Sequence, residues 1–212
     1  MKYKGIIFDL DGVICHTDSY HYLAWKKLAD RLGVYFDETI NNRLRGVSRM
    51  ESLDIILEQY KGLDFSSEIK EKLAAEKNDT YIELLKQLSR ENLSREVKET
   101  LDFLREKGYR LAIGSSSKNA RLILKQIGLE DFFDVISDGN NIVNSKPHPE
   151  VFLLAASYLN LEAKECLVVE DAKAGIDAAT AAYMDSAAIG DACGYQGANY
   201  NLDRFSQLEE IL

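Results

Sequence analysis

The pattern of hydrophobic and polar positions divides the chain into two kinds of segment. Short apolar runs, such as Ile6-Ile7-Phe8 and Cys166-Leu167-Val168-Val169, are typical of buried strands. Residues 18 to 88 instead repeat apolar residues at helical spacing. These residues are Leu23, Leu28, Leu32, Leu53, Ile56, Leu57, Ile69, Leu73, Tyr81, Leu84 and Leu85. We therefore expect an all-helical insertion after the first strand.

From Glu96 onward the pattern alternates between helix and strand. It predicts helices at about 95–107, 118–127 and 149–159, strands at 110–114 and near 135, 166 and 186, and a helix between the last two strands. Such alternation is typical of parallel strands joined by right-handed crossovers. The segment from Gly190 to Asn201 reads as a loop. The expected domains are an α/β core, residues 1–16 and 89–212, and a helical domain, residues 17–88.

Composition narrows the range of partners. The 212 residues are 46% hydrophobic, which suffices for one large core and a small second module. A net charge of −9 disfavours nucleic acid or an anionic membrane as a partner, because both require a basic face. The three cysteines show no CxxC spacing, and the chain begins without the features of a secretory signal. We expect a cytoplasmic protein with no disulfide and no membrane-spanning segment.

Acidic pairs follow two of the predicted strands. Asp9 and Asp11 come directly after Ile6-Ile7-Phe8, and Glu170 and Asp171 come after the apolar run that ends at Val169. The carboxyl ends of parallel strands meet at one edge of a sheet, which is the usual ligand position of open α/β folds. The pattern favours a metal site, although Asp-Leu-Asp-Gly alone is also typical of a simple turn.

Two further loops, together with the two acidic pairs, make a set of four motifs. Ser115 follows the predicted strand 110–114, and Lys146 lies in Ser145-Lys146-Pro147. With the acidic pairs, these motifs resemble those of the haloacid dehalogenase superfamily of phosphotransferases, and within it the β-phosphoglucomutase family. The resemblance extends through Gly190. It implies an α/β fold with a Rossmann-like core, a parallel sheet, and a small all-helical cap domain inserted after the first strand. It also suggests a cis Lys146-Pro147 bond.

The core motifs then acquire expected roles. A carboxylate can attack phosphorus and form an aspartyl-phosphate, and Asp9 is the candidate nucleophile. Asp11 is the candidate acid/base. Ser115 would bind phosphate oxygens, and Lys146 would offset their charge. The acids suit Mg²⁺. The ligands that the resemblance implies are Asp9, Asp171 and the backbone carbonyl of Asp11, with Glu170 assisting.

The helical segment is expected to select the substrate. Arg45-Gly46-Val47-Ser48-Arg49 looks like an anion clamp, because arginine binds phosphate bidentately. The resemblance implies that Arg49 holds the phosphate that is not transferred. Other residues also match family substrate contacts or phosphate-loop positions, and each has a plain structural alternative. These are His21 (a structural hydrogen bond), Ser52 and Lys77 (helix surface), and Ser117 and Asn119 (helix capping).

Three positions depart from the family pattern. His16 stands where an acid is common, Arg45 where lysine is usual, and Ala172 where serine is frequent. The change at His16 bears on motion of the cap, that at Arg45 on the anion clamp, and that at Ala172 on the surroundings of the metal. The phosphoryl chemistry is expected to be unaffected.

The resemblance implies a β-phosphoglucomutase that interconverts β-D-glucose 1-phosphate and glucose 6-phosphate. Its reaction would pass through the aspartyl-phosphate enzyme and β-glucose 1,6-bisphosphate, which serves as activator and intermediate. We expect a monomer whose partners are small sugar phosphates. The alternatives are a sugar-phosphate phosphatase of the same superfamily and a catalytically silent ligand-binding protein with the same fold.

Overall fold

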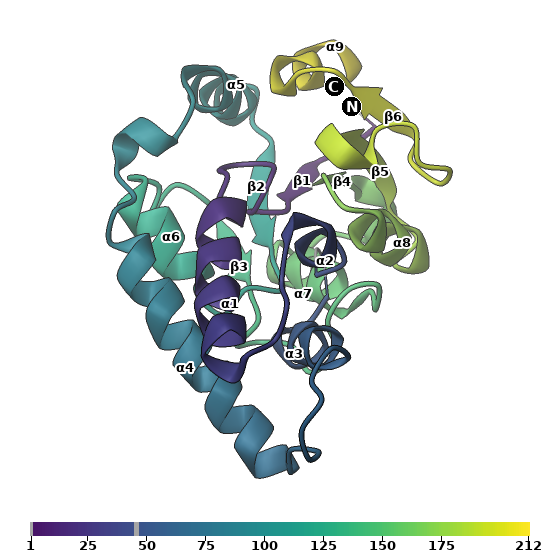
Figure 1. Cartoon of the computed structure of the whole chain (residues 1–212). Helices are drawn as coiled ribbons and strands as arrows, with labels where there is room; N and C mark the ends of the chain where they lie inside the picture. Colours follow the sequence, from purple (N-terminus) through teal and green to yellow (C-terminus); the bar gives the residue numbers. More distant parts are fainter. Residues whose placement is uncertain (1, 45–46) are drawn as a thin grey trace.

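Six parallel strands form the central sheet in a computed structural model that describes residues 2–44 and 47–212 (Figure 1). Their order across the sheet is β3-β2-β1-β4-β5-β6. The bounds are β1 Gly5–Phe8, β2 Arg110–Gly114, β3 Val135–Ser137, β4 Cys166–Glu170, β5 Asp185–Ile189 and β6 Tyr200–Leu202. The predicted α/β class with a parallel sheet is confirmed.

Strand β1 lies in the middle of the sheet. Its Phe8 is in register with Ile113 of β2 on one side and with Val169 of β4 on the other. All four of its residues are buried, as expected for a parallel strand covered on both faces. Asp9, the residue after β1, therefore leaves the sheet at its centre.

Helices cover both faces of this sheet. Side chains alternate along β1, so Ile6 and Phe8 join one apolar cluster while Ile7 joins the other. The first cluster includes residues of α5 (Arg95–Glu106), α6 (Ala120–Gln126) and α9 (Leu208–Ile211). The second includes residues of α7 (Glu150–Tyr158) and α8 (Lys173–Ala181). The 3-10 turns are η1 Arg90–Asn92, η2 Ala163–Glu165, η3 Gly190–Ala192 and η4 Phe205–Gln207.

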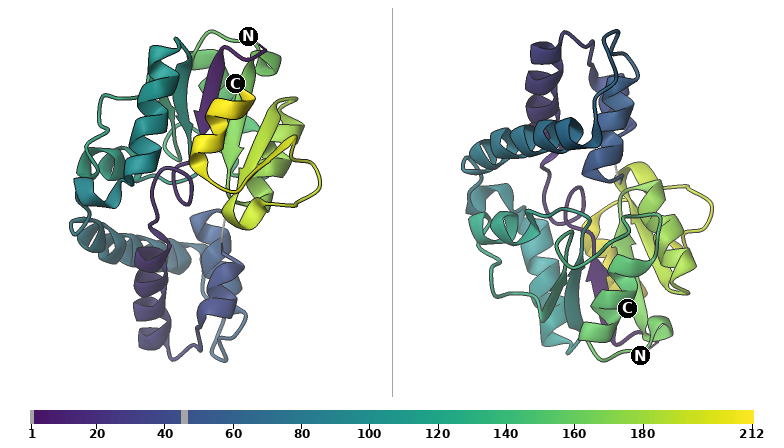
Figure 2. Two further views of the ribbon diagram at one scale, coloured as in Figure 1. Left: turned by 90° about the horizontal axis from the view of Figure 1, so that it is seen from above. Right: turned by 90° about the horizontal axis from the view of Figure 1, so that it is seen from below.

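The first four α-helices after β1, which we call the helical insertion, have a separate core. They are α1 Asp18–Leu32, α2 Glu38–Asn42, α3 Arg49–Leu57 and α4 Ser67–Leu85. Trp25, Leu53, Ile56 and Leu73 belong to this separate cluster. Figure 2 shows the four helices grouped at one end of the molecule. Tyr81 of α4 instead packs into the cluster of the sheet, which seats the insertion on the sheet domain.

Three details of the prediction are wrong. Leu23 and Ile69 were expected on apolar helix faces, yet they are 49% and 42% exposed. In α1 the buried stripe is formed by Ala24, Trp25, Leu28 and Ala29, so Leu23 falls outside it. The expected loop up to Asn201 contains η3 and the first two residues of β6, where Tyr200 pairs with Ala187.

One further expectation is met. The Lys146-Pro147 bond is cis. Ser48 caps α3, because its hydroxyl accepts a hydrogen bond from the backbone N–H of Glu51. The three cysteines are free, with Cys15 and Cys166 buried and Cys193 exposed. Within the described ranges, none of the helices combines the length and the apolar character that crossing a membrane requires.

Candidate active site

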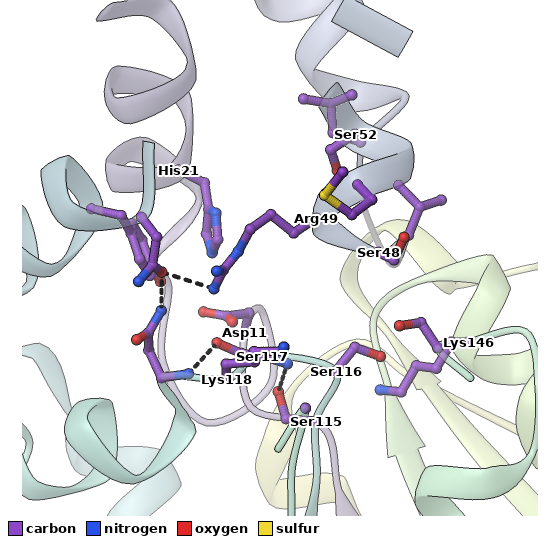
Figure 3. Close-up of a pocket in the computed structure, with 18 of the residues that line it drawn as sticks. Asp11, His21, Ser48, Arg49, Ser52, Ser115, Ser116, Ser117, Lys118 and Lys146 are labelled. Atoms are coloured by element: carbon purple, nitrogen blue, oxygen red, sulfur yellow. Dashed lines mark hydrogen bonds between the residues drawn. The ribbon is translucent and has the colours of Figure 1, made fainter. Parts of the chain in front are cut away.

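The predicted site residues gather around one cavity. It has a volume of about 640 Å³ and is lined by residues at the carboxyl ends of the strands and by residues of the helical insertion. Its lining includes Asp9, Asp11, His21, Arg49, Ser52, Lys77, Ser115, Ser117, Asn119, Lys146, Glu170 and Asp171. Figure 3 shows several of these side chains converging from the sheet domain and from the insertion. Arg45 and Gly46 lie outside the described residues.

Lys146 joins two acids at the ends of neighbouring strands. Its ammonium donates hydrogen bonds to Oδ1 of Asp9 and to Oε1 of Glu170, each at a distance of 2.5 Å. The other oxygen of Glu170 accepts a hydrogen bond from the backbone N–H of Ala172 at 2.8 Å. All three charged side chains are buried. The lysine therefore holds the two carboxylates in fixed positions.

Three carboxylates fit a divalent cation. Asp9, Glu170 and Asp171 each present an oxygen, and these atoms lie within 4.8 Å of one another. Gly12 has φ +87°, and a Cβ at this position would lie 2.0 Å from Oδ2 of Asp171. The glycine thus leaves room for this carboxylate. Such hard oxygen donors suit Mg²⁺.

The carboxylate of Asp11 is not part of this group of three and contacts Thr17 instead. The Thr17 hydroxyl donates a hydrogen bond to Oδ1 of Asp11. Tyr81 of α4 in turn donates from its phenol to the Thr17 hydroxyl at 3.0 Å. The candidate acid/base is therefore linked to the helical insertion, and the metal-binding atom that we expect from Asp11 is its backbone carbonyl. The sequence alone does not single out Thr17 or Tyr81 as site residues, because their contacts arise only from the packing of α4.

Burial changes the proton affinities of these groups. It raises the pKa of Asp9 well above the usual range, and the neighbouring charge of Glu170 adds to this effect against the opposing influence of Lys146. It also raises the pKa of Asp11 to about 6, although the hydrogen bond from Thr17 acts in the opposite direction. Burial alone would lower the pKa of Lys146, but Asp9 and Glu170 outweigh it and raise that pKa.

Lys77 lies in a buried aromatic box. Its Nζ is 2.8 Å from Nδ1 of His21, and it lies 4.7 Å from the ring centre of Trp25 and 4.6 Å from that of Tyr81. Burial, followed by the charge of Arg49, lowers the pKa of Lys77 to about 7. Burial, followed by the charge of Lys77, likewise lowers the pKa of His21. A helix-surface position is therefore wrong for Lys77, and also for Ser52, which is 4% exposed.

The segment Ser115–Asn119, which we call the serine loop, is folded by its own hydroxyls. Oγ of Ser115 accepts from the backbone N–H of Ser117 at 3.2 Å. Oγ of Ser117 accepts from the backbone N–H of Asn119 at 3.2 Å. Asn119 is the N-cap residue of α6 by position, but its side chain makes no capping hydrogen bond. Its amide is directed instead to the helical insertion.

Asn78, which sequence reasoning misses, connects the serine loop to Arg49. Its Oδ1 accepts from Nη2 of Arg49 at 2.8 Å and from Nδ2 of Asn119 at 2.9 Å. The only signal in the sequence is that Asn78 follows Lys77, which itself reads as a surface residue. Burial lowers the pKa of Arg49.

Comparisons with known proteins identify the family of this chain. The model of a hydrolase family described as haloacid dehalogenase-like hydrolase matches residues 3–182. The chain is 37% identical to the β-phosphoglucomutase of Bacillus subtilis over 207 residues, which cover 97% of this chain and 91% of that protein. It is 33% identical to a phosphorylated carbohydrates phosphatase of Thermotoga maritima over 184 residues, covering 86% and 82% of the two chains.

A solved structure extends the likeness to three dimensions. The crystal structure of a β-phosphoglucomutase from Clostridium difficile has a TM-score of 0.92 and 40% identity, covering 99% of this chain and 95% of that one. The family match spans most of the sequence, and the acids, serine and lysine of its loops meet at one cavity. The chain therefore belongs to the haloacid dehalogenase-like hydrolases, a family of enzymes.

Proposed function

We propose that this enzyme is a Mg²⁺-dependent β-phosphoglucomutase that interconverts β-D-glucose 1-phosphate and glucose 6-phosphate. The observation that carries the proposal is a cationic group on each side of one cavity. Lys146 lies beside Asp9 in the sheet domain, and Arg49 reaches the same cavity from α3 (Figure 3). A substrate with two phosphates can be held at both ends by such a cavity.

The first step in this mechanism is attack by Asp9 on the phosphorus of a bound sugar bisphosphate. The P–O bond to the sugar breaks, and an aspartyl-phosphate forms. Lys146 and the hydroxyl of Ser115 would offset the charge of the phosphoryl oxygens. Mg²⁺ held by Asp9, Glu170, Asp171 and the carbonyl of Asp11 would supply further charge stabilisation.

Asp11 moves the proton in each direction. As a carboxylic acid it protonates the departing sugar oxygen, and as a carboxylate it removes the proton of the attacking hydroxyl. A pKa of about 6 allows both forms near neutral pH. The link through Thr17 to Tyr81 joins this carboxylate to the helical insertion.

Residues 17–88 act in this proposal as a substrate-specificity domain. Arg49 holds the phosphate that is not being transferred, with Arg45 and Gly46, close to it in the sequence, assisting. His21, Ser52 and Lys77 contribute polar groups around the sugar. Glucose 1,6-bisphosphate would leave, turn end for end and present its other phosphate to Asp9. The expected partners are small sugar phosphates, and the expected form is a cytoplasmic monomer.

Hydrolysis is the second candidate activity. One relative at 33% identity is described as a phosphorylated carbohydrates phosphatase. The two activities share the aspartyl-phosphate and differ in whether water or a sugar hydroxyl attacks it. A cavity covered by the helical insertion favours the sugar, because it limits access of water.

The deciding experiment supplies β-glucose 1-phosphate, Mg²⁺ and catalytic glucose 1,6-bisphosphate, and records glucose 6-phosphate and free phosphate together. We expect glucose 6-phosphate without stoichiometric phosphate release. Free phosphate without isomerised sugar would assign the enzyme to the phosphatases.

A further inference from the structure

Asn78 occupies the junction between the helical insertion and the sheet domain. It lies in α4, and its side-chain oxygen has partners from α3 and from the serine loop. Arginine carries only donors, so the amide atom of Asn78 that faces Arg49 must be the oxygen. The atom of Asn119 that faces the same oxygen must then be its NH₂ group. The orientation of both amides follows from the arginine.

A continuous run of hydrogen bonds includes this oxygen of Asn78. It begins at Arg49 and passes through Asn78 to the side chain of Asn119. It continues from the backbone of Asn119 to Ser117, and from the backbone of Ser117 to Ser115. Figure 3 draws these contacts as dashed lines between the Arg49 guanidinium and Ser115. One end is the expected distal phosphate ligand, and the other is the expected ligand of the transferring phosphate.

We propose that Asn78 is a positioning residue that holds the Arg49 guanidinium and Asn119 together as one phosphate-binding unit across the two domains. This inference rests on the proposed function and deepens it, because it states how the second phosphate site is assembled. The ligand recognised is a phosphate monoester on the sugar end remote from Asp9. The site is complete only when α4 and the serine loop are as close as they are here.

The neutrality of the amide is part of this role. The Oδ1 of Asn78 fixes one N–H of Arg49 while leaving the positive charge of the guanidinium uncancelled. A carboxylate at this position would accept the same hydrogen bonds, but it would neutralise Arg49 and repel the phosphate. The variant Asn78→Asp therefore distinguishes two roles of Asn78: positioning Arg49 to bind a phosphate, and only joining the helical insertion to the sheet domain by hydrogen bonds.

The test measures calorimetric binding of glucose 1,6-bisphosphate with Mg²⁺ to the full chain, in an Asp9→Asn background that prevents turnover. Loss of one hydrogen bond to a charged group should weaken binding by about tenfold in Asn78→Leu. Asn78→Asp should weaken it at least as much. In the Arg49→Ala background, adding Asn78→Leu should cost less than about twofold, because coupled residues are not additive. Lys72→Ala, an exposed position on the same helix, is the control.

A second readout uses acetyl phosphate, which has no distal phosphate, in variants that retain Asp9. Asn78→Leu should slow enzyme phosphorylation by acetyl phosphate far less than it weakens bisphosphate binding. Wild-type affinity in Asn78→Leu or Asn78→Asp, or an equal loss with and without Arg49, would overturn the role of Asn78. If the wild type shows no mutase turnover but bisphosphate binding still depends jointly on Asn78 and Arg49, only the proposed function is overturned. If the wild type does not bind the bisphosphate, both the proposed function and the role of Asn78 are overturned.

Discussion

The Lys77 ammonium lies 2.8 Å from Nδ1 of His21, in a position that is 3% exposed. The ammonium form of Lys77 can only donate, so this form requires His21 to accept through an unprotonated Nδ1. Burial lowers the pKa of both groups, and that of Lys77 falls to about 7. A group with this environment makes the stability of the protein depend on pH.

Lys77→Met should stabilise the protein at pH 6 by more than at pH 9. The folded protein releases the Lys77 proton near pH 7, whereas the unfolded chain releases it near 10.5, so the unfolded state binds more protons between these values. Wild-type stability therefore rises with pH across this window, and the full penalty of the buried charge is present below it. Urea denaturation at both pH values measures the difference in the free energy of unfolding.

Lys72→Met provides the control for this experiment, because Lys72 lies exposed on the same helix. It should give no gain that depends on pH. An equal gain at pH 6 and pH 9 in Lys77→Met would contradict a buried charge at Lys77.

Asp9→Asn should abolish phosphorylation of the enzyme. An amide is a poor nucleophile toward phosphorus, so incorporation from labelled acetyl phosphate should fall by at least about a thousandfold. Asp102→Asn, in a half-buried ion pair of α5, should incorporate label as the wild type does. An unchanged burst of phosphorylation in Asp9→Asn would remove Asp9 from the mechanism. If the wild type turns over substrate and Asp9→Asn does not, the protein is not a catalytically silent binding protein.

The pH profile should report Asp11. Attack by a sugar hydroxyl on phospho-Asp9 needs the Asp11 carboxylate, so kcat/KM for this half-reaction should rise as pH increases through about 6. Asp11→Asn should slow transfer and lose this limb of the profile, while Mg²⁺ affinity stays close to wild type because the backbone carbonyl remains. Full mutase turnover in Asp11→Asn would reject the assignment.

Gly12→Ala should raise the Mg²⁺ concentration needed for activity. The new Cβ would lie 2.0 Å from Oδ2 of Asp171 and would displace this carboxylate. Gly108→Ala is a matched control, since Gly108 has φ +85° and a Cβ added there would meet nothing within 4 Å. Both variants should lose about 1 kcal/mol of stability from the left-handed backbone, but only Gly12→Ala should shift the Mg²⁺ titration of activity. Equal titrations would argue against the Asp171 site.

Much of the fold could be predicted because its strands are short apolar runs between helical patterns. Strand β6 could not, since it has three residues and its middle one is the exposed Asn201. The acidic pairs, Ser115 and Lys146 lie in loops after strands of one parallel sheet. The carboxyl ends of these strands share one edge of the sheet, so these residues could be predicted to lie together.

The insertion was harder to predict because its polar residues meet by packing. Lys77 reads as a surface residue until Trp25 of α1 and Tyr81 enclose it. Asn78 acquires its role only when α3, α4 and the serine loop meet, and no local pattern encodes this meeting.

The central position of β1 also bears on the stage of unfolding at which Asp9, the proposed nucleophile, becomes exposed to solvent. The backbone N–H of Asp9 donates to the carbonyl of Val169 at 2.9 Å, and the strand before it is paired on both sides. This amide can exchange its hydrogen with solvent only when the middle of the sheet opens, which is expected to require global unfolding. We therefore expect the proposed nucleophile to be attached to the slowest-exchanging part of the backbone, while the residues proposed to select its substrate lie on helices whose apolar core is largely separate from that of the sheet.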